Sequence, residues 1–216
     1  MATFETLNIN GTLNGFEAAL HGMRQPLQSF DKSDSYWEDG NYVIGPNDYK
    51  LAKALRKAGP EHCKYLRTIP VWVDITAPES WWVEFETYKV GTTANSTSTM
   101  HTLHREDLRE AFDFPFGVDQ DADAAFLNYL DNIKSIQERL NKLEKGTDLY
   151  NQYHDMLSRM LPRAFKYTRT VSLSYAVLAN MYAQRKNHRK AAWNTDFVSW
   201  VKSLPYSELI TGEFEE

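Results

Sequence analysis

The residues best suited to chemistry in this chain are cations gathered in one stretch. Between Met156 and Thr195 the sequence has eight Lys or Arg residues and no Asp or Glu. These cations are Arg159, Arg163, Lys166, Arg169, Arg185, Lys186, Arg189 and Lys190. The whole chain has a formal charge of −5, so the rest of the chain holds −13. A positive stretch in an acidic chain attracts small anions and predicts a site for a phosphorylated small molecule.

Two structural explanations compete with a ligand site. The cations could line the solvated face of a helix and a loop. Cations also stabilise the last turns of a helix through its dipole, which accounts for Arg185 and Lys186. The dipole does not account for Arg159 to Arg169, on the N-terminal side of the predicted helix. We therefore favour an anionic ligand.

A second candidate ligand segment runs from Gly91 to Thr102. It is rich in Thr and Ser, with Asn95 at its centre. This composition predicts a loop that offers hydroxyl and amide groups to a ligand.

Several common chemistries have no sequence signature here. Cys63 is the only cysteine, which excludes an internal disulfide and zinc sites built from thiolate pairs, and predicts a buried thiol. The close histidine pair, His101 and His104, lacks a His-Glu-x-x-His pattern, so no metal site is predicted. No glycine-rich phosphate loop of the Rossmann or Walker type occurs.

The first half of the chain predicts helices followed by strands. Apolar periodicity predicts helices at 16–23 and from Asn47 or Asp48 to the Gly59-Pro60 pair, with a polar, aromatic loop between them through Asp39 and Gly40. The period then changes to two, which predicts two strands, at 69–73 and 81–85, or one interrupted strand over the same residues.

The second half predicts long helices. A Leu and Ile stripe from Leu127 to Leu143 predicts a helix of about five turns that ends at Gly146. Further helices are expected at 150–160 and 167–189, and a short one at 197–204. This order predicts an α+β fold with several long helices in a single domain over residues 1–216.

Bulk properties limit the cellular setting and the partners. With 216 residues and 42% hydrophobic content the chain can bury a core. It has no signal-peptide pattern, and none of its apolar runs approaches the length of about eighteen residues that a membrane span needs. These features predict a soluble, cytoplasmic protein. The acidic balance makes nucleic acid an unlikely partner. Exposed aromatic residues and the Leu/Ile stripe favour a homo-oligomer.

Three segments together resemble the flavin-dependent thymidylate synthases. The first is the helix, Gly and Glu-His pair of LAKALRKAGPEH, at 51–62. The second is TANSTSTMH, at 93–101, which is similar to the second half of the family signature. The third is LPRAFKYTRTVSLSYAVLANMYAQR, at 161–185, where Pro162, Asn180 and Arg185 match a Leu-Pro pair and a later Asn and Arg of the family.

The resemblance implies a fold, a reaction and an assembly. The implied fold has an antiparallel sheet with several long helices, and the implied assembly is a homotetramer. The implied reaction is reductive methylation of dUMP, or a related pyrimidine nucleotide, with FAD, methylenetetrahydrofolate and NADPH.

The resemblance also assigns residues to two groups of contacts. For the nucleotide, Arg185 would hold the substrate, Ser98 its phosphate and Asn95 the geometry of the signature loop, while Arg159 lies one residue from an expected contact. For the flavin, Asn180 matches the family. The other cofactor positions would be Lys89, Thr93, Ser96 and Ser174.

The chain departs from the family at several of these positions. Tyr88, Lys89 and Val90 stand where the signature opens with Arg-His-Arg, and Ser96 replaces its Glu. Four further positions differ, since Met100 and His101 replace the signature Arg and Tyr, and Ser174 and Ala176 replace an Asn and an Arg that contact flavin.

Two functional hypotheses therefore remain open. The first is a flavin-dependent methyltransferase in which binding groups have been repositioned. The second is a nucleotide-binding protein of the same fold that has lost thymidylate synthesis and senses or sequesters a phosphorylated ligand.

Overall fold

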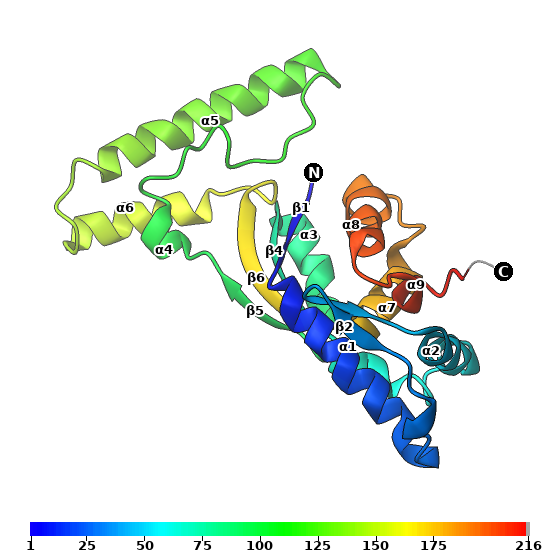
Figure 1. Ribbon diagram of the computed structural model, residues 1–216. Coiled ribbons are helices and arrows are strands. Elements are labelled where there is room, and N and C mark those ends of the chain that lie inside the picture. The colour runs from blue at the N-terminus through cyan, green and yellow to red at the C-terminus, as the bar shows by residue number, and fades with distance from the viewer. Residues whose placement is uncertain (215–216) are drawn as a thin grey trace. The chain divides into compact units, whose positions relative to one another are not determined.

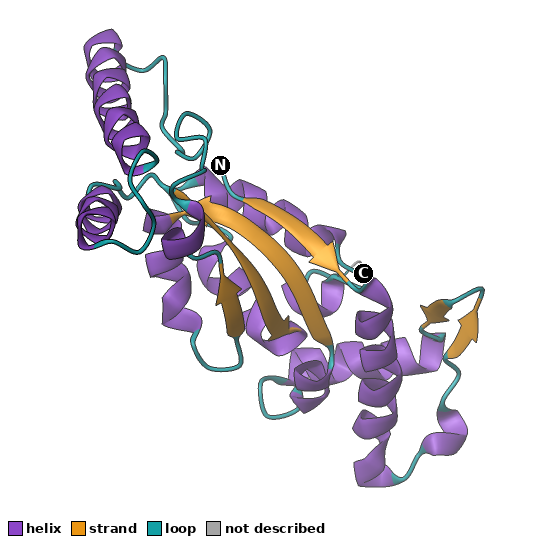
Figure 2. Ribbon diagram, turned by 90° about the vertical axis from the view of Figure 1, so that its left-hand side faces the viewer, coloured by secondary structure: helices purple, strands orange, loops and turns teal. Residues whose placement is uncertain are grey.

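The computed structural model describes residues 1–214, and these divide into two compact units. The first unit comprises residues 1–75, 86–95 and 170–214, and the second comprises residues 76–85 and 96–169. The four-stranded antiparallel sheet has the order β1-β4-β6-β5 (Figures 1 and 2). Its strands are β1 (Thr3–Leu7), β4 (Pro70–Pro78), β5 (Thr93–Ser96) and β6 (Lys166–Ser174). The predicted α+β class is confirmed.

The first unit contains most of the helices. They are α1 (Ile9–Arg24), η1 (Gln25–Leu27), η2 (Phe30–Lys32), α2 (Pro46–Ala58), η3 (Lys64–Thr68), η4 (Glu86–Tyr88), α7 (Tyr175–Arg185), η5 (Ala192–Phe197), α8 (Val198–Ser203) and α9 (Glu208–Thr211). The core of this unit is aromatic where α1 approaches α7. Phe16 meets Tyr175 edge to face, with ring centroids 5.2 Å apart. Gly15 allows the close approach of α1 to η3, because a Cβ there would lie 2.4 Å from Cδ of Pro70.

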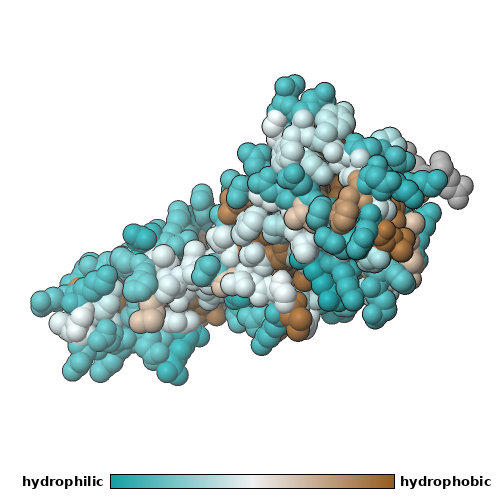
Figure 3. Space-filling model, turned by 60° about the horizontal axis from the view of Figure 1, so that its bottom comes forward, coloured by the Kyte–Doolittle hydropathy of each residue, from teal (hydrophilic) through white to brown (hydrophobic). Residues whose placement is uncertain are grey.

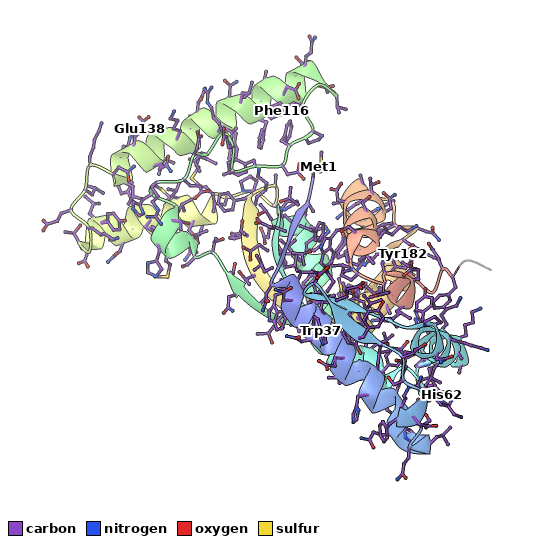
Figure 4. The ribbon with its side chains drawn as sticks, viewed as in Figure 1. Met1, Trp37, His62, Phe116, Glu138 and Tyr182 are labelled. Carbon is purple, nitrogen blue, oxygen red and sulfur yellow. The ribbon has the colours of Figure 1, made fainter. Side chains whose placement is uncertain are left out.

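The second unit is built around helices α5 and α6, which pack against each other, and the loops that lead to them. It contains α3 (Glu79–Phe85), α4 (Thr99–Thr102), α5 (Gln120–Leu140) and α6 (Asp148–Arg159). Its core is formed by Leu103, Leu108, Ala111, Phe112, Leu130, Ile133, Leu140, Tyr150, Leu157 and Phe165. Phe116, labelled in Figure 4, lies in the loop before α5 and contacts Phe114, which stacks on Phe126 at 3.9 Å.

A buried ion pair joins α1 to α2. Arg24 Nε donates to Asp48 Oδ1 at 2.6 Å, and their side chains are 4% and 0% exposed. Asp48 Oδ2 accepts from the Ser33 and Ser35 hydroxyls and from the backbone N–H groups of Asp34 and Ser35. The carboxylate therefore holds both helices and the 33–35 segment in place.

Most of the predicted helices are confirmed, with changed ends. Helix α1 is longer than the 16–23 segment, and α5 ends at Leu140 rather than at Gly146. Helix α2 begins at Pro46, before the expected caps, because Asp34 accepts the N–H groups of Asn47 and Asp48. Strand β4 contains the predicted 69–73 strand, and the Cys63 thiol is buried as predicted.

Two predicted elements were wrong. The segment 81–85 is helix α3, in which Trp81, Trp82 and Phe85 are buried together on one side. The segment 167–189 is strand β6 followed by α7. Burial alternates at the end of β6, where Val171 and Leu173 are buried and their neighbours are half-buried. That two-residue period was the signal for a strand.

Regions predicted as loops contain short regular elements. The 91–102 segment includes β5 and α4. The expected loop through Asp39 and Gly40 is a hairpin of β2 (Tyr36–Glu38) and β3 (Asn41–Val43), with Glu38 opposite Asn41. Both turn residues have positive φ, 48° and 77°, as an Asp-Gly hairpin turn requires.

Candidate ligand pocket beside helix α7

A pocket of about 1010 Å³ lies in the first unit, beside the start of α7. We call it the α7 pocket. Its wall is formed by Arg67, Pro70, Thr87, Tyr88, Val90, Gly91, Thr92, Thr93, Ser172, Leu173, Ser174, Ala176, Val177 and Asn180. Its volume is at the upper end of the range of roughly 300–1000 Å³ that is typical of ligand and cofactor sites.

The backbone around the pocket is fixed by contacts that the η3 segment makes with the start of α7 and with α2. The N–H of Tyr175 donates to the Ile69 carbonyl at 3.0 Å, which places the end of β6 beside the end of η3. Tyr65, in η3, donates its hydroxyl to the Ala52 carbonyl at 2.9 Å. Burial raises the pKa of Tyr65, so it remains a neutral donor.

The lining combines hydrogen-bonding groups with apolar side chains. The polar groups are the hydroxyls of Thr87, Thr92, Thr93, Ser172 and Ser174, and the Asn180 amide. Ser174 is the residue that precedes α7, and its hydroxyl does not cap the helix. The apolar groups belong to Pro70, Val90, Leu173, Ala176 and Val177. This combination suits a planar heterocycle with polar edges.

The charge of the lining is positive. Arg67 is the one charged residue among the fourteen that line the pocket, and the lining contains no Asp or Glu. The N-terminal end of α7, at Ser174 and Tyr175, also carries a partial positive charge. The pocket therefore favours a neutral or anionic ligand.

The structure brings together three of the five residues assigned to the cofactor. Thr93, Ser174 and Asn180 line the α7 pocket. Lys89 is exposed and does not line it, and the Ser96 hydroxyl donates to the Thr97 carbonyl at 3.0 Å. The roles of all five remain predictions.

The four residues assigned to the nucleotide do not line this pocket. Asn95 and Arg185 belong to the first unit, and Ser98 and Arg159 belong to the second. Asn95 and Ser98 are exposed. Arg159 Nε donates to Asp155 at 2.8 Å, within the same helix.

Arg185 has partners within the first unit. Its Nε donates to the Tyr88 hydroxyl at 2.7 Å, and its guanidinium lies 4.7 Å from the ring centroid of the buried Trp193. Tyr88 donates in turn to Gln184 at 3.0 Å. Since Tyr88 lines the α7 pocket, Arg185 holds part of the pocket wall.

The basic stretch is divided between the two units. Arg159, Arg163, Lys166 and Arg169 belong to the second unit, and the other four cations belong to the first. Arg169 lies over the Trp82 ring at 4.4 Å, and Lys186 is 3.7 Å from Glu213. Glu213 also accepts from the hydroxyl of Tyr182, which is labelled in Figure 4. Lys166 lines a pocket of about 230 Å³ with Glu106, Asp107 and Glu110. These contacts favour structural roles for much of the stretch.

Sequence reasoning missed Arg67 and Ser172. Arg67 follows the first family-like segment, at 51–62, and Ser172 lies within the third one, at 161–185, but neither matched a position of the family to which a role was assigned. The available signal was the two-residue alternation of β6, which places Ser172 and Ser174 on one side of the strand.

Two other classes of feature, a metal centre and a membrane-spanning helix, have no support within residues 1–214. Within residues 1–214, no three His, Cys, Asp or Glu side chains are grouped as metal ligands. No helix in this part of the chain is long and apolar enough to cross a membrane. The face seen in Figure 3 shows hydrophobic side chains in small patches among hydrophilic ones. Scattered patches of this kind are normal for a folded domain.

Comparison with solved structures identifies the fold. Thymidylate synthase X (ThyX) from Helicobacter pylori with FAD and dUMP matches with a TM-score of 0.69 and 15% identity, over 97% of this chain and 96% of that chain. A second Helicobacter pylori ThyX structure, complexed with FAD and dUMP, matches with a TM-score of 0.65 and 15% identity, over 99% of both chains. The UMP/dUMP methylase PolB from Streptomyces cacaoi, bound with 5-Br dUMP, matches with a TM-score of 0.61 and 13% identity, over 98% of this chain and 95% of that chain.

The chain therefore has a ThyX-like fold, and its sequence has diverged far from these structures. The resemblance drawn from the three sequence segments is confirmed at the level of the fold. No protein-family model and no curated protein sequence matches the chain.

Replacing Gly91 with Ala is expected to disturb the α7 pocket. Gly91 has φ +81°, and a Cβ there would lie 2.9 Å from Cγ2 of Val177. We expect a loss of about 1–3 kcal/mol in the free energy of unfolding, from the positive φ and the contact together. Gly40→Ala is the control, because Gly40 has φ +77° and nothing within 4 Å of its Cβ position.

Urea denaturation and ligand titration of both variants check this prediction. Gly40→Ala should lose only the stability that a positive φ costs an alanine, and its ligand affinity should be unchanged. Equal losses of stability in the two variants, with equal ligand affinity, would show that the Val177 contact does not shape the pocket.

Proposed function

We propose that the chain binds a flavin in the α7 pocket and catalyses the reductive methylation of a pyrimidine nucleotide. The observation that carries the proposal is the convergence of Thr93, Ser174 and Asn180 in one pocket of about 1010 Å³. These residues come from β5, the end of β6 and α7, and the family resemblance assigned them to the cofactor. The likeness in fold to proteins described with FAD and dUMP gives further support.

The chemistry of the lining fits a flavin. An isoalloxazine ring has one edge of carbonyl and N–H groups and another edge of methyl groups. Thr93 and the Asn180 amide can bond the polar edge, while Ala176 and Val177 can contact the apolar edge. The chain would thus use neutral hydrogen bonds in place of the Asn and Arg that contact flavin in the family, where it has Ser174 and Ala176.

The protein's part in such a reaction is binding, orientation and exclusion of water. A bound flavin supplies hydride transfer, so the chain itself does not need a nucleophilic side chain. Tyr88 borders the pocket and is held by Arg185 and Gln184. This arrangement fixes the phenol ring at the wall where a substrate base could lie against it.

The nucleotide contacts are the second part of the proposal. Asn95, Ser98, Arg159 and Arg185 are proposed to contact the substrate, by the family resemblance. For Arg185 this requires the guanidinium to exchange the Tyr88 hydroxyl for a phosphate oxygen, which is a stronger, charge-assisted acceptor. UMP and dUMP are the candidate substrates, because proteins of this fold are described with them.

The proposal also extends to the assembly and the remaining reactants. A homotetramer, a cytoplasmic location, a folate one-carbon donor and NADPH follow from the family resemblance. Light scattering during size-exclusion chromatography tests the tetramer. Flavin reduction by NADPH, followed by its reoxidation on adding methylenetetrahydrofolate and dUMP, tests the reactants.

The visible absorbance spectrum tests the proposed flavin. After incubation with FAD and gel filtration, the protein is expected to retain bands near the flavin maxima. It is then expected to convert dUMP or UMP to the 5-methyl product when NADPH and the folate are supplied. A protein that remains colourless after incubation and gel filtration would contradict the flavin proposal.

An alternative function is nucleotide binding without methylation. The observation that favours it is the lining itself, which has Ser174 and Ala176 in place of the Asn and Arg that contact flavin in the family, and which contains no His, Asp or Glu. In this case a pyrimidine nucleotide occupies the α7 pocket. A colourless protein that binds dUMP or UMP in a calorimeter would support this function over the first.

A further inference from the structure

We infer that Arg67 is the anion anchor of the α7 pocket, and that the pocket takes a phosphorylated ligand through this residue. The inference rests on the proposed function, because it concerns the same pocket. It assigns the phosphate contact to a residue outside the basic stretch and outside the signature-like loop.

The first support is the charge balance of the lining. Arg67 is the one cation among fourteen lining residues, and no carboxylate accompanies it. Within residues 1–214 its side chain forms no ion pair and no hydrogen bond, so its five N–H donors face solvent or the pocket. Other cations near the ends of α7 are already engaged, as Arg185 is with Tyr88.

The second support is the rigid backbone that carries Arg67. Its neighbours Tyr65, Leu66 and Ile69 are 6%, 1% and 0% exposed. The Thr68 hydroxyl donates to the Tyr65 carbonyl at 2.7 Å, which closes the η3 turn. The Cα of Arg67 is therefore held in place while its side chain stays free to reach a ligand.

The third support is the set of donors around the guanidinium. Ile69 accepts the N–H of Tyr175, so the η3 segment lies beside Ser174 at the start of α7. The hydroxyls of Ser172 and Ser174 have no hydrogen-bond partner among the described residues. A phosphate oxygen between them would receive a charged fork from Arg67 and neutral donors from the serines.

Pairs of ligands that differ by one phosphate test the anchor directly. Titration of the full chain with FMN and riboflavin, and with dUMP and deoxyuridine, measures the preference for the phosphate. In at least one of the two pairs, we expect the unmodified chain to bind the phosphorylated ligand about ten- to a hundredfold more tightly than its unphosphorylated partner. In Arg67→Gln this preference should fall to within about twofold, with unchanged affinity for the unphosphorylated member. Arg67→Lys should retain part of it.

Lys64→Ala is the matched control. Lys64 lies in the same η3 segment but lines a different pocket, of about 370 Å³, between α1 and α2. This variant should keep the full phosphate preference. Because Arg67 is exposed, the preference should also decrease with added salt in the unmodified chain and not in Arg67→Gln.

The outcomes separate the anchor from the proposed function. If dUMP binds with an Arg67-dependent preference and no flavin binds, the flavin proposal is wrong and the anchor stands. If flavins bind and Arg67→Gln keeps the full preference for FMN, the anchor is wrong and the flavin proposal stands. If none of the four ligands binds at millimolar concentration, both are wrong.

Discussion

Asp48→Ala is expected to lower the free energy of unfolding by about 3–5 kcal/mol, a large part of the stability of a domain of this size. The physical reason is the charge that the substitution leaves behind. Arg24 is 4% exposed, and without Asp48 its guanidinium would be buried with only neutral partners, which are the Ser29 and Lys32 carbonyls and the Ser29 hydroxyl. The two N–H groups and two hydroxyls that Asp48 accepts would also lose their acceptor.

The exposed pair Asp155 and Arg159 gives the control. These side chains are 62% and 78% exposed and form one i, i+4 contact. Asp155→Ala should therefore change the free energy of unfolding by no more than about 0.5 kcal/mol. Guanidinium denaturation followed by circular dichroism measures both variants. Losses below 1 kcal/mol in both would mean that the Asp48 network contributes little.

The pH dependence gives an independent reading of the same carboxylate. Burial alone would raise the pKa of Asp48, but hydrogen bonds from Ser35, Ser33, Arg24 and the Asp34 N–H outweigh burial and lower it. A lowered pKa in the folded state means that the ionised form stabilises the fold above the unfolded pKa, near about 4. This contribution is lost as pH falls through the folded pKa. The difference between the parent and Asp48→Ala should accordingly shrink below about pH 4.

The sequence predicted the long helices because their stabilising pattern is local. The Leu and Ile stripe of α5 and the Gly59-Pro60 end of α2 are visible without tertiary information. The family resemblance added the sheet, which contains strands far apart in the chain. Its strand β1 was missed, because its five residues are all exposed or half-buried and give little periodicity.

The two wrongly predicted segments, 81–85 and 167–189, have in common that their sequences are compatible with both a helix and a strand. In TVSLSYAVLANMY the apolar residues fit a helix and a strand about equally well, and the boundary at Ser174 depends on the backbone bond from Tyr175 to Ile69. In ESWWVEF the aromatic residues favour a strand by propensity, but packing against one another favours a helix. A backbone bond between distant segments decided the first case, and packing of aromatic rings within the helix decided the second.

The candidate site was predictable only in part, for a similar reason. Thr93, Ser174 and Asn180 could be chosen by resemblance to a family. Arg67 could not, because its importance comes from the absence of any other charge around it in the folded pocket. The eight cations that attracted attention were conspicuous in sequence, yet none of them lines the α7 pocket.

Ala176→Trp is expected to weaken ligand binding in the α7 pocket by about a hundredfold or more, while leaving the protein folded. Ala176 is half-buried and its side chain faces the pocket, one helical turn before Asn180. An indole there would occupy the space beside Ser174 and Val177 that a planar ligand needs. A hundredfold loss corresponds to about 2.7 kcal/mol of binding free energy, a plausible effect of losing that contact surface.

Ala183→Trp separates this steric effect from a general effect of the indole on α7. Ala183 lies two turns further along the same helix, is exposed, and does not line the pocket. Both variants should unfold within about 1 kcal/mol of the parent, and only Ala176→Trp should lose affinity for FAD or dUMP. Unchanged affinity in Ala176→Trp would place the ligand elsewhere. Because the test measures binding and not catalysis, it shows whether the α7 pocket holds the ligand under both the flavin hypothesis and the nucleotide-binding hypothesis.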